Sequence, residues 1–425
     1  MNFYFDMVGC RLNQSEIERM ANQLHALGHV ILSDPTQADV IIINTCCVTA
    51  KAAADSRKMI RHYASNHDSK LVVTGCWGTL FSEEAISLPG VTHVVANPQK
   101  ENLVKDLLSG VTNLFNDYQY RRHPIPGNRK RTRAFIKVQD GCDEHCTYCI
   151  TRIARGESKS LPFEMIKKEV NAAIEGEVKE IVLSGVQLGS WGKDLEPKQR
   201  IGDLIASILE DERLARIRLS SIEPWDLYPE VFELWRDSRL CRHLHIPLQS
   251  GSEKILKRMA RRIKPAAYQT LIDQAREEIT GIAITTDIIV GFPGETDADF
   301  QESVEFVTKM QFSGGHVFSY SAMPGTFAAT LPNQVDSAKR KRRNLIMRDV
   351  IAKSQERFFE KSLKQITHVL WEKFEDRNGK VYLSGLTDNY IRTLAESNED
   401  LRNRISLVRL DELDHHGGMI GEIVG

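Results

Sequence analysis

Three closely spaced cysteines constrain this chain more than any other feature of its sequence. They are Cys142, Cys146 and Cys149, separated by three and two residues. Thiolates suit iron–sulfur chemistry, and three on one short loop can hold three irons of a four-iron four-sulfur cluster. The fourth iron then has no protein ligand, so a small molecule can bind there and receive an electron. A structural zinc site is the alternative, but His145 is badly placed within the loop to serve as its fourth ligand.

The composition argues against disulfides and against a membrane protein. Eight cysteines in 425 residues are too few and too clustered for a small secreted disulfide scaffold, and the length allows two or three domains. No signal peptide is evident, and no apolar run approaches the roughly 20 residues of a spanning helix. We therefore expect a cytoplasmic protein with no membrane partner. With 56 basic and 57 acidic residues, any nucleic-acid surface must be local.

A second set of cysteines follows three predicted strands near the N-terminus: Cys10, Cys46 and Cys76. The strands alternate with helical segments, which predicts an open parallel α/β sheet. Because the carboxyl ends of parallel strands share one edge, we expect these cysteines to converge and form a second ligand set. The alternative is that they are small apolar residues at strand ends. Cys47 and Cys46 point in opposite directions on an extended segment, so they are not expected to share a cluster. The three strands are predicted at residues 2–7, 40–44 and 71–74.

A helix is predicted between the first two of these strands, at residues 13–27. Ile17, Met20 and Leu24 recur at helical spacing. Asn13, with Glu16 three residues later, resembles a capping box and predicts that the helix begins there.

The central part of the chain alternates strands with amphipathic helices, the pattern of an incomplete parallel barrel with the Cys142 loop beyond its first strand. The predicted strands are residues 135–139, 180–183, 216–220, 243–248, 284–290 and 316–320. The helices between them include residues 164–174, 201–209 and 268–279. Glycine and polar residues follow several of these strands, and glycine lets the backbone approach a bound cofactor closely. The candidate cofactor-binding residues at these strand ends are Ser184, Gly185, Gln187, Ser221, Glu223, Gln249, Ser250 and Gly291.

The last part of the chain predicts a small all-β barrel of about five strands. An Asn378-Gly379 hairpin turn separates the first two strands. Acidic residues match the basic ones here, which weakens a simple electrostatic case for RNA binding by this part. The predicted strands are residues 368–374, 381–386, 390–395, 405–410 and 419–424.

Two basic segments are candidates for phosphate contacts. Residues 118–133 carry six lysines and arginines with two prolines and one glycine, which is typical of an interdomain linker. Residues 338–348 have a helical pattern and include the run from Lys339 to Arg343. A solvated hinge and a solvated helix face are the respective alternatives.

Together these motifs resemble the methylthiotransferases, a branch of the radical S-adenosylmethionine (SAM) superfamily. The resemblance rests on GCRLNQ from Gly9, NTC from Asn44, TGC from Thr74, and the Cys142 loop with Tyr148 before its last cysteine. It implies a [4Fe-4S] cluster on each cysteine set, Cys46 rather than Cys47 as a ligand, and SAM as cofactor, with Tyr148 and the strand-end residues contacting it. The implied domains are an N-terminal α/β domain (residues 1–117), a basic linker (118–133), a radical SAM partial (β/α)6 barrel (134–360) and a TRAM-like β-barrel (361–425).

The resemblance also implies a reaction, the insertion of a methylthio group at an unactivated carbon–hydrogen bond. The Cys142 cluster would pass an electron to SAM and generate a 5′-deoxyadenosyl radical, which takes the hydrogen. The second cluster would hold the sulfur that is methylated and delivered. A two-cluster electron carrier and an RNA-binding module with vestigial clusters are alternatives from other functional classes.

Substrates in this family are adenosine derivatives beside the tRNA anticodon, or an aspartate of a small-subunit ribosomal protein. Three segments look most like the branch that acts on N6-threonylcarbamoyladenosine rather than isopentenyladenosine: NTCCVT at residues 44–49, DSRKMIR at 55–61 and RLSSIEP at 218–224. The expected partners are the anticodon stem-loop of tRNA, an electron donor such as a flavodoxin or ferredoxin, and a sulfur donor.

Overall fold

The computed structural model describes residues 1–66, 68–108, 132–377, 379–397 and 399–425. The chain forms two compact units, each built from several segments. The first contains residues 1–177, 183–199 and 321–329, and the second contains residues 178–182, 200–320 and 330–425. The predicted linker lies outside the described residues except for Thr132 and Arg133. The boundaries of the four predicted segments stay predictions.

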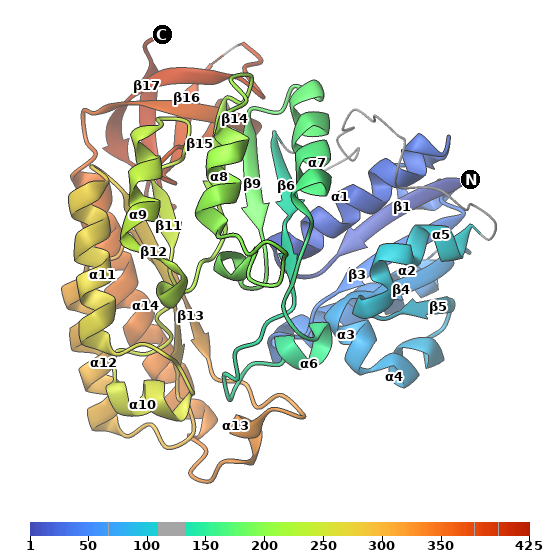
Figure 1. Ribbon diagram of the computed structural model, residues 1–425, viewed down its shortest axis with the longest axis horizontal. Coiled ribbons are helices and arrows are strands. Elements are labelled where there is room, and N and C mark those ends of the chain that lie inside the picture. The colour runs from blue at the N-terminus through green and yellow to red at the C-terminus, as the bar shows by residue number, and fades with distance from the viewer. Residues whose placement is uncertain (67, 109–131, 378, 398) are drawn as a thin grey trace. The chain divides into compact units, whose positions relative to one another are not determined.

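The N-terminal part of the first unit is a five-stranded parallel sheet in the order β2-β1-β3-β4-β5 (Figure 1). The predicted strands are confirmed as β1 (Asn2–Met7), β3 (Val40–Thr45) and β4 (Lys70–Thr74). Sequence analysis missed β2 (Val30–Ile31) and β5 (Val91–Val95). Both are edge strands with partly exposed residues, so neither shows the continuous apolar run that marks a buried strand.

Helices cover both faces of this sheet because alternate residues of its strands point to opposite sides. Val40 and Ile42 pack with α1 (Arg11–Ala26) and α5 (Leu103–Leu107). Ile41 and Ile43 pack in a second core. That core includes residues of α2 (Ala50–Asn66), α3 (Gly75–Leu80) and α4 (Ser82–Ser87). This part of the chain also contains two short 3₁₀ turns, at Pro35–Gln37 (η1) and Asn97–Asn102 (η2).

The rest of the first unit surrounds the Cys142 loop. Strand β6 (Arg133–Lys137) leads into β7 (Gln139–Asp140), which pairs antiparallel with β8 (Lys159–Ser160). The loop and α6 (Thr151–Arg155) lie between these two short strands, and α7 (Phe163–Glu175) and η3 (Leu188–Ser190) follow. The pairing of β7 with β8 therefore fixes both ends of the cysteine loop.

The second unit contains most of the predicted strand–helix repeats. Its strands are β9 (Glu180–Ser184, of which the first three residues belong here), β10 (Arg216–Leu219), β11 (His243–His245), β12 (Ala283–Val290) and β13 (Gly314–Ser319). Strands β11, β12 and β13 pair in parallel. The helices are α8 (Ile201–Leu209), α9 (Pro229–Phe232), α10 (Glu253–Arg258), α11 (Pro265–Glu278), α12 (Asp297–Met310) and α14 (Ser337–Glu360), with 3₁₀ turns η4 (Pro224–Asp226) and η5 (Glu233–Arg236). Helix α13 (Phe327–Thr330) spans a boundary between the units. All six strands predicted from the repeat pattern are thus present.

The C-terminal part is a closed β-barrel in the order β14-β15-β16-β18-β17, as the sequence predicts (Figure 1). Its strands are β14 (Ile366–Arg377), β15 (Lys380–Thr387), β16 (Arg392–Glu396), β17 (Ile405–Leu413) and β18 (Met419–Ile423). Trp371, Leu383 and Val408 lie in its apolar core. Arg377 pairs with Lys380, which confirms the two-residue hairpin, although Asn378 itself lies outside the described residues. No helix in the described part of the chain is long and apolar enough to cross a membrane.

A buried ion pair connects the C-terminal barrel to the strand–helix repeats of the second unit. Arg218 is fully buried and donates from Nε to Glu180 Oε1 at 2.9 Å. It also donates to the backbone carbonyls of Thr387 and Asp388, and its guanidinium lies 5.0 Å from the ring centroid of Tyr390. Removal of Arg218 would leave the Glu180 carboxylate with less compensation in a buried place.

We expect Arg218→Met to lower the free energy of unfolding by about 3–5 kcal/mol, because it removes one partner of a buried pair. Arg213→Met is the matched control, since Arg213 forms a pair with Asp211 while more than half exposed. It should cost less than about 1 kcal/mol. Urea unfolding followed by circular dichroism measures both. Equal losses in the two variants would contradict the structural role of Arg218.

Candidate active site

The cysteines of the N-terminal sheet lie at the carboxyl ends of three neighbouring strands. Cys10 follows β1 and directly precedes α1, Cys46 follows β3, and Cys76 lies in the first turn of α3 directly after β4. Strands β1, β3 and β4 are adjacent and parallel. All three cysteines therefore lie at one edge of the sheet, as the sequence predicts.

Cys46 lies between the other two members of this set. A Cβ atom built on Gly9, the residue before Cys10, would be 3.0 Å from Cys46 Cβ. Burial raises the pKa of the Cys46 thiol to about 12, and Cys10 and Cys76 contribute to that rise while Arg155 opposes it. Burial also raises the pKa of Cys47, which interacts electrostatically with Cys76 and Cys46. Cys46 thus neighbours both other cysteines, and its choice over Cys47 as a ligand stays a prediction.

Tight backbone packing places Cys76. Gly75 has φ +93°, and a Cβ atom there would lie 2.2 Å from the carbonyl oxygen of Thr45. No larger residue fits this close approach between the ends of β3 and β4. Gly75 therefore allows Cys76 to follow its strand without separating it from Cys46.

The Cys142 loop is held in a similar way. Gly141 has φ +69°, and a Cβ atom there would lie 1.8 Å from the carbonyl oxygen of Glu157. The Cys142 N–H donates to Gly156 O, and the Cys149 N–H donates to Cys146 O at 3.0 Å. Hydrogen bonds within the loop thus bring its cysteines onto one short turn.

The donor set fits a four-iron cluster better than a zinc ion. All eight cysteines are described and none forms a disulfide. In the described part of the chain, no three His, Cys, Asp or Glu side chains are arranged to hold one metal ion. In a four-iron cluster each cysteine binds a different iron, so the three sulfurs surround one cluster without all lying within bonding distance of a single ion. His145 is turned to Arg152, with Nδ1 2.9 Å from Nη1, so it is not placed as a fourth zinc ligand.

Several predicted cofactor-binding residues of the first unit lie near the Cys142 loop. Gln187 Oε1 is 3.3 Å from Cys142 Sγ, and the Gln187 N–H donates to Gln139 Oε1. Ser184 is buried, and its Oγ finds no hydrogen-bond partner among the residues that the structure describes. Gly185 leaves room for Gln139, whose Oε1 would be 2.9 Å from an added Cβ. Tyr148 is half-buried on the loop itself.

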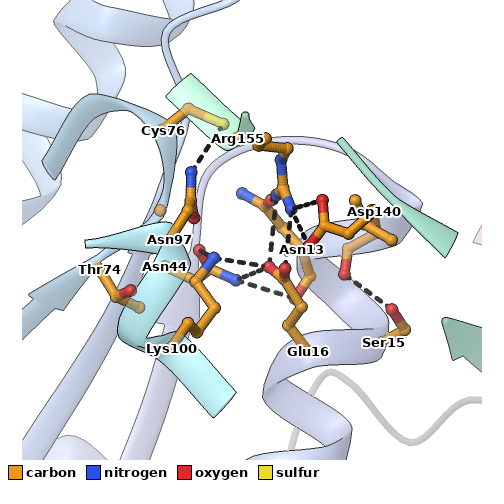
Figure 2. Close-up of polar contacts among 12 residues, drawn as sticks. Asn13, Ser15, Glu16, Asn44, Thr74, Cys76, Asn97, Lys100, Asp140 and Arg155 are labelled. Atoms are coloured by element: carbon orange, nitrogen blue, oxygen red, sulfur yellow. Dashed lines mark hydrogen bonds and ion pairs between the residues drawn. The ribbon is translucent and has the colours of Figure 1, made fainter. Parts of the chain in front are cut away.

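A buried ionic cluster connects the two cysteine regions within the first unit (Figure 2). Arg155, at the end of α6, donates to Glu16 Oε1 at 2.8 Å, to Asp140 Oδ1 at 2.9 Å and to Asn13 Oδ1 at 2.9 Å. Lys100 donates to Glu16 Oε2 at 2.8 Å. Asn13 and Glu16 belong to the helix that follows Cys10, whereas Asp140 precedes Cys142 by two residues. The cluster therefore ties the beginning of α1, next to Cys10, to the Cys142 loop.

Opposite charges control the protonation of this cluster. Burial raises the pKa of Glu16, but Arg155, Lys100 and Lys137 outweigh it and hold that pKa well below its usual range. Burial also opposes the charge on Arg155, yet Glu16 keeps its pKa well above the ordinary value. Glu16 and Arg155 are therefore both ionised at neutral pH.

The capping-box interpretation of Asn13 and Glu16 is wrong. Helix α1 begins at Arg11, and its N-terminal boundary residue, Cys10, makes no side-chain capping hydrogen bond. Asn13 and Glu16 are both buried. Asn13 Nδ2 donates to the carbonyls of Val8 and Thr45. Sequence analysis missed the roles of Lys100 and Arg155, because their common partner Glu16 is far away in the chain. The sequence around Glu16 carries no pattern that identifies its two cationic partners.

Comparison with known proteins identifies the family. Residues 136–307 match the Radical SAM superfamily, and residues 2–96 match the uncharacterized protein family UPF0004. The threonylcarbamoyladenosine tRNA methylthiotransferase MtaB of Thermotoga maritima is 36% identical over 96% of this chain and 94% of its own length. The protein of the same name from Bacillus subtilis is 33% identical over 96% and 93%. The tRNA-2-methylthio-N(6)-dimethylallyladenosine synthase of Clostridium tetani is 33% identical over 91% and 88%.

The chain belongs to the radical SAM tRNA methylthiotransferases. It is therefore an enzyme that transfers a sulfur-containing group, and the cofactors of this family are SAM and [4Fe-4S] clusters. Among solved structures, the radical SAM methyltransferase TsrM of Kitasatospora setae, with cobalamin and a [4Fe-4S] cluster bound, superposes with a TM-score of 0.57. It is 12% identical and covers 75% of this chain and 74% of its own, so the likeness concerns the fold.

In this methylthiotransferase the other predicted cofactor-binding residues belong to the second unit. Glu223 forms an ion pair with Arg261 at 2.6 Å, and Ser250 Oγ lies 3.0 Å from Ser303 Oγ. The Gly291 N–H donates to Glu295 Oε2, and Arg340 packs where a Cβ atom would lie. Ser250 and Gly291 therefore each make a hydrogen bond within the second unit, and their contact with a cofactor stays a prediction. Ser221 forms an isolated parallel β-bridge with His245. Gln249 has a positive φ of +74°, a backbone conformation that residues other than glycine rarely adopt.

The basic run of the methylthiotransferase at Lys339–Arg343 is largely used inside the second unit. Arg343 is buried and forms ion pairs with Glu295 and Asp297, both at 2.7 Å. Lys339 also forms an ion pair with Asp297, and Arg340 donates to the carbonyl of Tyr320. The solvated-face alternative is therefore wrong for Arg343. Lys341 and Arg342 are exposed and stay candidates for phosphate contacts.

We expect Glu16→Gln to lower the free energy of unfolding of this methylthiotransferase by about 3 kcal/mol or more at pH 7, since it leaves buried cations uncompensated. Glu16 contributes fully above about pH 4.3, the ordinary glutamate pKa, and loses its contribution as pH falls towards its lower folded-state pKa. The difference between wild type and variant should therefore shrink in acid. Urea unfolding from pH 7 to pH 3 measures it. Glu396→Gln, on an exposed pair with Lys380, should show no such difference.

Proposed function

We propose that this enzyme inserts a methylthio group at the 2-position of N6-threonylcarbamoyladenosine, next to the anticodon of tRNA. One observation supports the reaction: six cysteines that form no disulfide, three at strand ends and three on one loop, lie in the same compact unit. The substrate is supported by the names of the Thermotoga maritima and Bacillus subtilis relatives, which specify threonylcarbamoyladenosine.

In this proposal Cys142, Cys146 and Cys149 hold the cluster that binds SAM, and Cys10, Cys46 and Cys76 hold the second cluster. When bound, the first cluster supplies the electron that cleaves SAM, and the second carries the sulfur to be transferred. Gln187 orients the loop through its contact with Cys142. Ser184 Oγ offers a hydrogen bond to the bound cofactor, which accounts for a buried hydroxyl without a partner among the described residues.

The remaining SAM contacts in this proposal come from Tyr148, Gly185 and the strand-end residues of the second unit. Those residues are Ser221, Glu223, Gln249, Ser250 and Gly291. The partners are the tRNA anticodon stem-loop, an electron donor such as a flavodoxin or ferredoxin, and a sulfur donor, in the cytoplasm. Exposed Lys341 and Arg342 provide positive charge suited to tRNA phosphates.

A second candidate substrate is the dimethylallyl form of the same adenosine. It is favoured by the synthase of Clostridium tetani, which is nearly as similar as the other relatives. The two substituents differ in chemistry, because the threonylcarbamoyl group carries a carboxylate and a hydroxyl whereas dimethylallyl is apolar.

We expect the purified enzyme, supplied with reductant, SAM and a sulfur source, to methylthiolate a tRNA that carries threonylcarbamoyladenosine. Nucleoside mass spectrometry should then show a mass gain of about 46 daltons, because one CH3S group replaces one hydrogen. A matched tRNA with dimethylallyladenosine is the control. Modification of the control alone would reverse the substrate assignment without affecting the reaction.

We expect about eight irons per reconstituted chain, consistent with two four-iron clusters. Replacement of Cys142, Cys146 and Cys149 by alanine should halve the iron and abolish 5′-deoxyadenosine formation.

Cys46→Ala should abolish methylthiolation but leave SAM cleavage largely intact, whereas the variant of its neighbour, Cys47→Ala, should have only a mild effect on methylthiolation. Iron analysis and product chromatography measure these outcomes. A severe effect of Cys47→Ala with a mild effect of Cys46→Ala would move the ligand by one residue.

A further inference from the structure

Two side chains connect the Cys10, Cys46 and Cys76 set to helix α6. The first is Asn97, whose Nδ2 lies 3.6 Å from Cys76 Sγ and donates to the carbonyl of Ala154 at 2.8 Å. The second is Arg155, whose Nη2 donates to Asn13 Oδ1, an atom 3.9 Å from Cys10 Sγ (Figure 2). The last two residues of α6 thus reach the two outer cysteines of the set, each through one asparagine.

The amide of Asn97 has a defined orientation. A backbone carbonyl can only accept a hydrogen bond, so the nitrogen of the amide must face Ala154. The same nitrogen lies 3.6 Å from Cys76 Sγ and can donate its second hydrogen to the sulfur. Asn97 is itself fixed, because its backbone N–H donates to Thr79 Oγ1 of α3 at 2.9 Å. The N–H···S contact is therefore built into the fold.

Both groups favour added negative charge on the sulfur ligands. Reduction of an iron–sulfur cluster adds one electron, and hydrogen bonds to the sulfurs and nearby net charge set its potential. A donor N–H and a buried guanidinium both stabilise the reduced form more than the oxidised form. Cys76, Asn97 and Arg155 are buried, so solvent screens their interactions only weakly, whereas Cys10 is exposed.

We propose that Asn97 and Arg155 are positioning residues that raise the reduction potential of the cluster held by Cys10, Cys46 and Cys76. This inference rests on the proposed assignment of that cluster. It adds a role that the two residues perform from outside the ligand set, and it makes the second cluster depend on the helix that follows the Cys142 loop.

The test uses the full chain with Cys142, Cys146 and Cys149 replaced by alanine, so that only the second cluster remains. In that background we compare Asn97→Leu, which removes the donor, with the isosteric Asn97→Asp, which replaces it with an acceptor. Redox titration followed by electron paramagnetic resonance should show a lower midpoint potential in both, with the larger shift for Asn97→Asp. Unchanged potentials in variants that keep their iron would overturn the role of Asn97.

For Arg155, the same titration compares Arg155→Met with the charge-conserving Arg155→Lys. The methionine variant should have a lower potential, and lysine should restore most of it. Lys137→Met is the matched control: it removes a buried cation of the same ionic cluster that pairs with Glu101, Asp140 and Glu16 rather than with Asn13, the residue beside Cys10. Its potential should be unchanged. A shift as large as that of Arg155→Met would show a general charge effect and would overturn the specific role of Arg155.

A measurement on the unsubstituted protein covers variants that fail to fold. After exchange into deuterated water, electron–nuclear double resonance of the reduced second cluster should detect an exchangeable hydrogen, as an N–H···S bond requires. Its absence would overturn the Asn97 contact. A cysteine-to-alanine background that binds no iron would instead overturn the cluster assignment, and with it this inference, so the two failures are distinguishable.

Discussion

The ion pair between Arg155 and Glu16 is the interaction on which the arrangement of the first unit depends. Taking both charges out of water costs several kcal/mol per ion, and only close, well-directed contacts offset that cost. Here Glu16 accepts from Arg155, Lys100 and Asn44, and each of these donors comes from a different element. Because such contacts tolerate little displacement, they fix the position of α6 relative to α1 and β3. A patch of apolar side chains would bring the same elements together with less precise registration.

This precision matters because the segments that carry the cysteines meet at this cluster. Cys10 directly precedes α1, and Cys142 follows the short strand β7 after a glycine. Each segment has one buried apolar side chain close by, Leu12 after Cys10 and Ile150 after Cys149. Asn13, Asp140 and Arg155 add polar anchors, since they lie within a few residues of Cys10, Cys142 and Cys149 respectively. The ionic cluster thus fixes the positions of the two cysteine segments relative to each other.

Local patterns correctly predicted the buried strands of the N-terminal sheet and the cysteines at their ends, because those features depend on short-range rules. The apolar run of β3 reflects burial on both faces, and the position of Cys46 after it follows from the shared edge of a parallel sheet. The same kind of rule failed at Asn13 and Glu16, because a capping box and a buried polar pair can have identical spacing. Glu16 and Arg155 are 139 positions apart, and no local pattern indicates that pairing. The basic run at Lys339–Arg343 misled for a similar reason, since its acidic partners Glu295 and Asp297 lie over 40 positions earlier.

Fold and chemistry separate clearly in this protein. TsrM shares much of the fold at 12% identity, so the fold accommodates chemistry other than this chain's own family reaction. In this chain three adjacent strands of the N-terminal sheet each end near a cysteine. Cys46 and Cys76 are buried there, with Asn97 and Arg155 buried beside them, whereas Cys10 is exposed. The set therefore has one solvent-facing side at Cys10 and a buried side at Cys46 and Cys76. On the buried side the edge is lined by Asn97 and Arg155, which come from segments far from the strands in sequence, so that lining depends on contacts that no single segment of the chain provides.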